Sequence, residues 1–228
     1  MYTIQTKDEA EVKIIPKPEN ISWEEITELL NIAFQQRVEQ GLNYLAATQG
    51  VEVTKRRVAG GICLVALINN KLVGTATLHI VKTENNRKKW FYESSYGYLS
   101  QLAVHPKYKS KGIGGKLQKE RIRLCYENKV DAILGDTSVH AKDLLEWHRR
   151  MGAQKVGYLS HTTTNYYSVQ FRKPIYGKKF NNAYVFIRYN LSKCICKLTK
   201  TKYGKLTLIG RIAKKIIITG KKQTLPIS

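Results

Sequence analysis

The sequence predicts a mixed α/β fold in which helices flank one sheet. Seven short segments have the apolar composition of strands, and four segments carry the apolar spacing or the end signals of helices. Their order is strand, two helices, three strands, helix, strand, helix and two strands, which is typical of an α+β sheet. At 228 residues the chain is long enough for one substantial domain with some length left over.

The N-terminal part is predicted to hold a short strand and two helices. The strand is expected over residues 12–16. Ser22 and Glu25 then have the spacing of a capping box, in which each side chain accepts a hydrogen bond from the other residue's backbone N–H group. This spacing predicts an amphipathic helix over 22–40, and a second short helix is expected over 42–48.

A β-hairpin and a further strand follow. Residues 62–68 and 72–81 are rich in apolar and β-branched residues, as strands are. Asn69 and Asn70 between them tolerate the positive φ of a tight turn. After a polar connection, the next strand is expected over 96–105.

The C-terminal part is predicted to alternate helices and strands. The expected elements are a helix over 113–128, a strand over 132–136, a helix over 142–151, and strands over 153–158 and 165–173. Residues 183–191 have the composition of one further strand.

The composition argues against a membrane span, a secretory signal and a metal site. No segment approaches the roughly 20 apolar residues of a membrane-spanning helix, and the N-terminus lacks the apolar stretch of a secretory signal. The four cysteines show neither C-x-x-C spacing nor a histidine partner, so no metal site is expected. From this composition we expect a cytoplasmic protein.

The positive charge is concentrated in the C-terminal part. Residues 1–146 carry 21 Lys and Arg against 17 Asp and Glu, whereas residues 147–228 carry 18 Lys and Arg and no acidic residue. Such a field attracts anionic partners such as nucleic acid, acidic lipid or acidic glycans. Specific nucleic-acid binding is not expected, because zinc-finger and RNP patterns are missing and aromatic residues are sparse after Tyr203.

Residues 99–117 predict an anion site built from backbone. An apolar strand and a basic loop lead into Gly112, Gly114 and Gly115, where a helix begins. Glycine lets peptide N–H groups approach a phosphate closely, and the first helical turn adds unpaired N–H groups and the positive end of its dipole. The spacing fits neither a Walker A loop nor a dinucleotide fingerprint, which would need glycine at Leu117.

The glycine loop resembles the acyl-CoA signature of the GNAT superfamily of N-acetyltransferases. The family pattern Arg/Gln-x-x-Gly-x-Gly/Ala falls on residues 109–114, with Lys109 first, and lysine keeps the charge but lacks the planar fork of arginine. The resemblance in element order covers about residues 11–175. It implies a GNAT-type mixed, mostly antiparallel sheet of six to seven strands, splayed between strands four and five, with acetyl-CoA as co-substrate.

The resemblance implies that backbone holds most of the CoA. The pantetheine arm would enter the gap between strands four and five and pair with the end of strand four, and the pyrophosphate would lie on the glycine loop. The implied residues are Leu102, Ala103 and Val104 for the pantetheine, and Lys109, Ser110, Lys111, Gly112, Ile113, Gly114 and Gly115 for the pyrophosphate.

A second resemblance lies at residues 141–153. With the alignment fixed on Gly152, His148 occupies the position of the tyrosine that usually protonates the leaving thiolate in this family. His148 is therefore a candidate general acid, since a free imidazole has a pKa of about 6.5 and exchanges protons near neutral pH. The alternative is an ordinary histidine on a solvent-facing helix.

The general base has a weaker signal. Many relatives carry Glu in or beside strand four, where this chain has Ser100 and Gln101. The candidates are Asp136, at the end of strand five, and Glu93, upstream of strand four. A water relay, or an acceptor amine that is already partly neutral, is the alternative.

Residues 176–228 are expected to form a basic extension outside an acetyltransferase domain of residues 1–175. Lys and Arg alternate with Leu and Ile over 192–222, and part of this segment has the apolar face of a surface-lying amphipathic helix. Two interpretations stay open. The extension could attach the protein peripherally to the anionic inner surface of a membrane, or its apolar residues could pack on the catalytic body or on the second subunit of a homodimer.

Three functional hypotheses follow from the sequence. The first is transfer of an acetyl group from acetyl-CoA to the amine of a small-molecule acceptor, such as an amino sugar or an amino acid derivative, by direct attack in a ternary complex. The second is a protein N-acetyltransferase. The third is an acyl-CoA-binding module without transferase activity, because Gln101, Lys109 and His148 depart from the family pattern.

Overall fold

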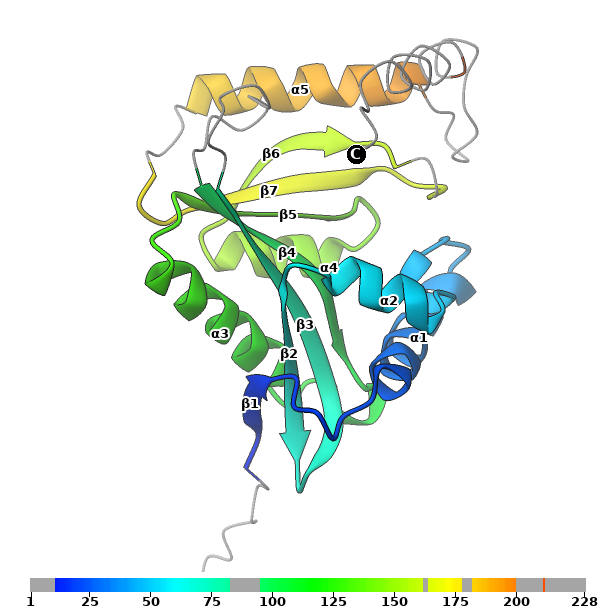
Figure 1. Cartoon of the computed structure of the whole chain (residues 1–228). Coiled ribbons are helices and arrows are strands. Elements are labelled where there is room, and N and C mark those ends of the chain that lie inside the picture. The colour runs from blue at the N-terminus through cyan, green and yellow to red at the C-terminus, as the bar shows by residue number, and fades with distance from the viewer. Residues whose placement is uncertain (1–10, 83–94, 162–163, 178–181, 200–210, 212–228) are drawn as a thin grey trace, which may run out of the picture.

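The computed structural model describes residues 11–82, 95–161, 164–177, 182–199 and 211. Helices surround a single sheet (Figure 1). The strands are β1 (Lys13–Pro16), β2 (Ile62–Ile68), β3 (Lys71–Lys82), β4 (Ser95–Val104), β5 (Ala132–Ser138), β6 (Gln154–Leu159) and β7 (Ser168–Pro174). The helices are α1 (Trp23–Glu39), α2 (Val51–Val58), α3 (Ile113–Glu127), α4 (Lys142–Arg150) and α5 (Asn182–Thr199), with 3-10 turns η1 (Leu45–Ala47) and η2 (Pro106–Tyr108).

The described sheet has seven strands in the order β1-β2-β3-β4-β5-β7-β6. The pair β4–β5 is parallel, and the other five neighbouring pairs are antiparallel. The predicted fold class is therefore confirmed. The parallel pair lies at the centre of the sheet, and α3 forms the crossover that a parallel connection requires.

Alternate residues of β2 show how the sheet buries both faces. Val65 and Leu67 pack with Ile26 and Leu30 of α1, in a cluster that also includes Val58 of α2. Their neighbours Leu64 and Ala66 instead pack with the first turns of α3. Because successive side chains of a strand point to opposite faces, α1 and α2 cover one face and α3 covers the other. Figure 1 shows α1 and α2 on the right of the sheet and α3 on the left.

The α3 face also carries α4. A third cluster on this face joins Cys125 of α3 with Ile133 of β5 and Phe171 of β7. The His148 ring of α4 stacks on the Phe171 ring, with centroids 3.8 Å apart. On this face the β5–β7 part of the sheet is thus covered by α3 and α4, the two helices that flank β5 in sequence.

Two local sequence signals are confirmed in detail. Ser22 Oγ accepts a hydrogen bond from Glu25 N at 3.1 Å, and Glu25 Oε2 accepts one from Ser22 N at 2.7 Å, which is the predicted capping box. Asn69 and Asn70 have φ angles of 49° and 63°, so both adopt the left-handed conformation of a tight hairpin.

The region between α1 and β2 differs from the prediction. The short helix expected over 42–48 is a 3-10 turn over Leu45–Ala47, and α2 over Val51–Val58 was not predicted. The sequence of α2 is polar and rich in β-branched residues, so neither its apolar spacing nor its helix propensity is strong. Packing of Val58 against α1 and β2 stabilises the helix, which the local sequence alone would not.

The strand expected over 183–191 is wrong, because these residues belong to helix α5. Val, Ile, Phe and Tyr give this segment a strand-like composition, but Tyr189, Ser192 and the buried Cys196 follow helical spacing along one side. The Tyr189 hydroxyl donates to the Tyr158 hydroxyl of β6 at 3.0 Å. The exposed side of α5 carries Phe186, Ile187, Leu191, Ile195 and Leu198.

The remaining expectations for the extension lie mostly outside the described residues. Of the basic segment 192–222, the structure describes 192–199 and 211. The domain division at residue 176, the membrane association and the homodimer therefore stay predictions. Among the described helices, none is both long and apolar enough to cross a membrane.

Candidate functional site

The gap predicted between strands four and five is present. In the described sheet, β4 and β5 pair from Tyr96–Ala132 to Leu99–Gly135, and no described pair continues beyond this point. A bulge follows directly in β4, since Gln101 and Leu102 lie opposite the single residue Ala76, and Gln101 has a φ of 50°. The end of β4, with Leu102, Ala103 and Val104, thus separates from β5.

The glycine loop has the backbone geometry of the predicted anion site. Ser110 and Gly112 have φ angles of 63° and 75°, and Gly112 is the residue that precedes the first turn of α3. No side chain caps this turn. The N–H groups of the first helical turn are orphan donors in any helix, so a bound phosphate would satisfy them.

Open space in front of the loop fits a diphosphate. A Cβ atom added to Gly112 or Gly115 would meet no atom within 4 Å, and one on Gly114 would meet only Val104 Cγ2 at 3.7 Å. The loop is also basic: Lys109 Nζ donates to Gln36 Oε1 of α1 at 3.1 Å, and Lys111 Nζ lies over the Tyr108 ring. The predicted CoA-binding residues 109–115 are thus brought together around one open backbone surface.

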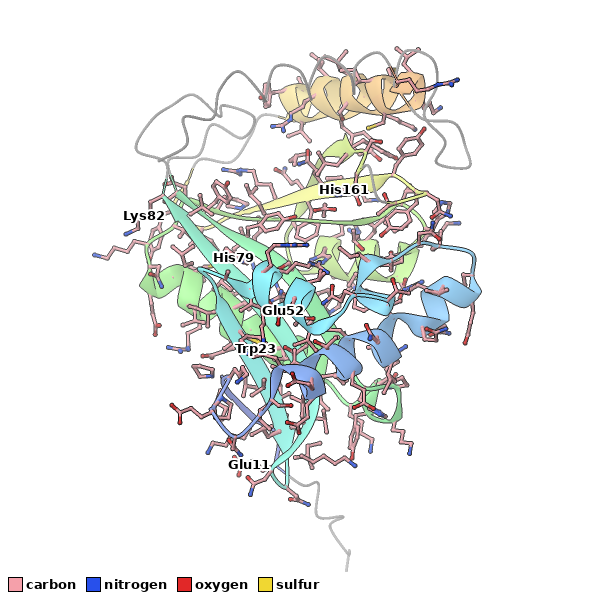
Figure 2. The ribbon with its side chains drawn as sticks, turned by 45° about the vertical axis from the view of Figure 1, so that its right-hand side comes forward. Glu11, Trp23, Glu52, His79, Lys82 and His161 are labelled. Atoms are coloured by element: carbon pink, nitrogen blue, oxygen red, sulfur yellow. The ribbon has the colours of Figure 1, made fainter. Side chains whose placement is uncertain are left out.

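At the other end of the gap, three polar side chains form a hydrogen-bonded cluster. Asp136 follows Gly135, the last β5 residue paired with β4. Its Oδ1 accepts a hydrogen bond from the Tyr98 hydroxyl at 2.8 Å, and its Oδ2 lies 3.0 Å from Nε2 of His161. His161 lies after β6, and Figure 2 labels it above Glu52 of α2 and to the right of His79.

The environment of this cluster keeps Asp136 ionised. Burial alone would raise the pKa of Asp136, but the hydrogen bonds and charge of His161 and the hydrogen bond from Tyr98 bring it below its usual value. Burial and the negative charge of Asp136 raise the pKa of Tyr98, so the phenol stays protonated near neutral pH. A carboxylate that accepts from two neighbours is thus a stable hydrogen-bond acceptor and a weak base.

Aromatic residues and tied loops lie next to the cluster. The Tyr44 ring lies 5.4 Å from the Phe34 ring and 4.8 Å from the Tyr166 ring. Asn165 connects the two loops involved, since its Oδ1 accepts from Asn43 N at 2.9 Å and its Nδ2 donates to Gly41 O at 2.7 Å. The segment after α1 and the segment before β7 are therefore held together beside Asp136.

His148 lies on the opposite face of the sheet from Asp136. Its ring stacks on Phe171, whose Cα partner is Gly135, the neighbour of Asp136 in β5. His148 is 7% exposed, so the alternative of a solvent-facing histidine is not what the structure shows. Burial, together with the charge of Arg121, lowers the pKa of His148 to about 4. Its imidazole is neutral near pH 7, and the predicted general-acid role stays a prediction.

The cation beside His148 is itself buried. Arg121 of α3 donates to Thr77 O at 3.3 Å and to Ser100 O at 3.2 Å, and its other guanidinium nitrogen donates to Gln118. Burial lowers the pKa of Arg121 to about 9. Arg121 therefore fastens α3 to β3 and β4 where the bulge begins.

Sequence reasoning located part of this site. It predicted the glycine loop and Asp136, whereas Glu93 lies outside the described residues. It did not single out His161 or Tyr98 as partners of Asp136. The sequence alone does not show that the end of β5 lies beside the loop that joins β6 to β7. Only the strand order β5-β7-β6 brings them together. Among the described residues, no group of three or more His, Cys, Asp or Glu could hold a metal ion.

Comparison with known proteins identifies relatives over the central part of the chain. The sequence model of the acetyltransferase (GNAT) family matches residues 23–153. N-alpha-acetyltransferase 30 of Xenopus laevis is 32% identical over 91 residues, which is 40% of this chain and 31% of that protein. The human protein of the same name is 31% identical over 91 residues, or 40% of this chain and 23% of that protein. The chain thus spans less than a third of the length of these curated relatives.

Solved structures share the fold at low sequence identity. The NatC complex bound to Gag peptide and CoA contains a chain with a TM-score of 0.55 and 16% identity, covering 72% of this chain and 99% of that one. The ribosomal-protein-S18-alanine N-acetyltransferase of Escherichia coli has a TM-score of 0.57 and 12% identity, covering 75% and 98%. The names of these relatives specify N-alpha or protein acceptors, so the small-molecule acceptor expected from the sequence has no support among them.

Proposed function

Because the chain belongs to the acetyltransferase (GNAT) family, we propose that it transfers an acetyl group from acetyl-CoA to the N-terminal α-amine of a protein or peptide. Acetyl-CoA is the co-substrate of this family. The second sequence hypothesis, a protein N-acetyltransferase, thus replaces the first. Its support is the N-alpha-acetyltransferase relatives together with the geometry of the site.

The observation that carries the proposal is the end of the β4–β5 pairing at Leu99–Gly135. On one side of this gap lies the open backbone surface of residues 109–115, which fits a diphosphate. On the other side lie Tyr98, Asp136 and His161, which fit an amine that must lose a proton. A pantetheine arm placed in the gap would bring its thioester to the acceptor from the diphosphate side.

The chemistry needs little from side chains at the thioester. The backbone of Leu102 to Val104 would pair with the amides of the pantetheine, and a backbone N–H group there would stabilise the oxyanion of the tetrahedral intermediate. Holding both reactants in one geometry supplies much of the rate enhancement of such a transfer. The tied loops at Asn43 and Asn165 fit a requirement to fix an extended acceptor beside Asp136.

Acetylation of a peptide panel tests the proposal. The purified full chain would be incubated with acetyl-CoA and peptides that carry each of the 20 residues at position one, with N-terminally blocked peptides and small amines as controls, and the products would be mapped by mass spectrometry. We expect acetylation of free α-amines and none of blocked peptides. Acetylation of small amines alone would overturn the proposal, and CoA binding without any transfer would favour an acyl-CoA-binding module.

A further inference from the structure

We propose that Arg57 binds a carboxylate of the acceptor, so that the chain prefers acceptors with an acidic group close to the amine. This inference rests on the proposed function, because it names the class of peptide that would be acetylated, one with Asp or Glu as its first or second residue. Arg57 lies in the last turn of α2, the helix that the sequence did not predict.

A buried hydrogen-bond network holds the Arg57 guanidinium in place. Arg57 Nη1 donates to Gln49 Oε1 at 2.6 Å, and Gln49 Nε2 donates to Thr54 Oγ1 at 2.7 Å. Thr54 is hydrogen-bonded in turn to Thr27 of α1, with 2.8 Å between the two hydroxyl oxygens. Gln49, Thr54 and Thr27 are all buried. A cation whose position is fixed in this way loses little conformational entropy when it binds a ligand.

The charge of Arg57 has no carboxylate in direct contact. A guanidinium has five N–H donors, and the side-chain hydrogen bond that Arg57 makes goes to the neutral amide of Gln49. Among the ion pairs between described residues, none includes Arg57. Burial lowers the pKa of Arg57, but a guanidinium still stays charged near pH 7. A half-buried charge is costly unless an opposite charge meets it, so an arriving carboxylate would be stabilised here.

Arg57 also lies near the end of the gap where the acceptor amine is placed. It is close enough to Tyr98, Tyr166 and Asp136 to interact electrostatically with each of them. Asp136 does not form an ion pair with it, because one carboxylate oxygen accepts from Tyr98 and the other lies 3.0 Å from His161 Nε2. A negative and a positive group therefore lie near each other without direct contact. This pattern is complementary to an acceptor that carries an amine and a carboxylate.

The reach of these charges limits where the carboxylate of the acceptor can be. Charge interactions weaken strongly beyond about 10 Å, and an extended peptide spans about 3.5 Å per residue. A carboxylate that meets Arg57 while the α-amine lies at Asp136 therefore belongs to the first or second residue. The α-carboxylate of a free amino acid has the same chemistry and a similar spacing, so the experiment has to distinguish these two sources.

The positive field of the whole chain is a competing cause of a preference for acids. The net charge is +22, and such a field attracts any anion. Salt separates the two causes, because it screens exposed charges and long-range fields but screens a partly buried contact much less. A preference that depends on Arg57 should therefore persist at high salt.

Binding of paired peptides tests the inference. Peptides with a free α-amine and an amidated C-terminus would carry Asp or Asn, or Glu or Gln, at position one or two. The Kd of each would be measured by calorimetry with CoA bound, and the readout does not depend on turnover because CoA carries no acetyl group. We expect the acidic member of at least one pair to bind at least about tenfold more tightly, as a charge-assisted hydrogen bond would allow, and to keep this advantage at about 0.5 M salt.

Variants in the last turn of α2 locate the effect. Arg57→Gln should reduce the advantage of the acidic peptide to about twofold or less while the Kd for CoA stays the same. Arg56→Gln removes the same charge from the exposed neighbour and should leave the advantage unchanged. Arg57→Lys keeps the charge without the planar fork, so it should retain part of the advantage. A merely structural role of Arg57 would weaken binding of the acidic peptide and the amide peptide equally.

The outcomes keep this inference distinct from the proposed function. Equal binding of acidic and amide peptides by the wild-type chain, an advantage that disappears at high salt, or an unchanged advantage in a folded Arg57→Gln would overturn the inference. Acetylation of neutral peptides with the same kcat/KM as acidic ones would also overturn it and would leave the proposed function standing. Free amino acids and their α-amides are measured in the same way. Carboxylate-dependent binding of free amino acids, without binding of any peptide, would support the role of Arg57 and overturn the proposed function.

Discussion

The two ends of the gap between β4 and β5 differ in which groups form them: backbone at one end and side chains at the other. At the diphosphate end, residues 109–115 present backbone N–H groups and open space, because three of these residues are glycines without a side chain. At the acceptor end, Tyr98, Asp136 and His161 form a chain of side-chain hydrogen bonds. A backbone site depends on conformation and tolerates side-chain changes, whereas a side-chain site depends on the identity of each residue.

The largest expected effect concerns His148, which lies on the opposite face of the sheet from Asp136. If the comparison holds, His148 belongs to neither end of the gap. The folded-state pKa of about 4 lies below the unfolded value of about 6.5, so between these pH values the unfolded chain binds a proton that the folded chain does not. Stability should therefore fall as the pH is lowered through this window, by about 2 to 3 kcal/mol between pH 7 and 4.5. Urea unfolding of wild type and His148→Phe would measure the difference.

His148→Phe keeps an aromatic ring against Phe171 but has no group that titrates there. We expect the stability of this variant to fall less than that of wild type as the pH is lowered. Its kcat at neutral pH provides the second readout. An unchanged kcat would remove His148 from the mechanism and reject the general-acid prediction. Equal acid sensitivity of the two proteins would show instead that the histidine is not buried in its neutral form.

The next largest effect is expected at Gly112. If a change of this residue left CoA affinity unaltered, the idea that backbone binds the diphosphate would be wrong. Gly112 has a φ of 75°, where a β-branched residue is strained, so Gly112→Val should distort the start of α3. We expect the Kd for CoA, measured by calorimetry, to rise about 30-fold, which is about 2 kcal/mol. Gly152→Val is the control, since Gly152 has a φ of 83° and similarly open space at the end of α4. It should lower stability without changing CoA affinity.

A smaller and opposite pair of effects is expected at Gly115. This residue lies in the first turn of α3 with helical backbone and nothing within 4 Å of an added Cβ. Gly115→Ala should stabilise the helix by about 0.5 to 1 kcal/mol and raise the Tm by about 2 °C. The same methyl group should obstruct the diphosphate and raise the Kd for CoA about fivefold. An unchanged Kd would place the diphosphate elsewhere.

The smallest effect is expected at Lys109, where side chain and backbone can be compared in the same loop. Lys109 is exposed and bonded to Gln36, and exposed charges contribute little once salt screens them. Lys109→Ala should raise the Kd for CoA about threefold at low salt, and the difference should vanish at 0.5 M salt. A loss of tenfold or more at high salt would show that side chains, and not backbone, dominate this end.

The comparison also explains what the sequence could and could not predict. The glycine loop was recognisable because its residues are consecutive and because glycine is needed where φ is positive, as at Gly112. His161 was not, since it comes next to Asp136 only through the strand order β5-β7-β6, in which distant segments become neighbours. A contact between side chains 25 positions apart leaves no local pattern in the sequence.

The fold follows the same division. The seven strands and the capped helix α1 carry strong local signals, and their positions were predicted within a few residues. Helices α2 and α5 were missed because tertiary packing overrides their local composition: Val58 packs into the core of the α1 face, and Cys196 is buried beneath α5. Periodicity over the full 18 residues of α5 would have favoured a helix, but the first nine residues alone do not.

The packing of α5 on β6 also affects how copies of this protein could associate. β6 is the last strand of the sheet as far as the described residues show it, and a bare last strand offers N–H and C=O groups to any other strand. Here the N–H group of Tyr158 donates to Ser192 Oγ of α5 at 2.9 Å, so the helix takes the place of a neighbouring strand. Joining two sheets edge to edge through β6 would require α5 to be displaced first. The helix therefore protects this edge of the sheet against strand pairing and aggregation.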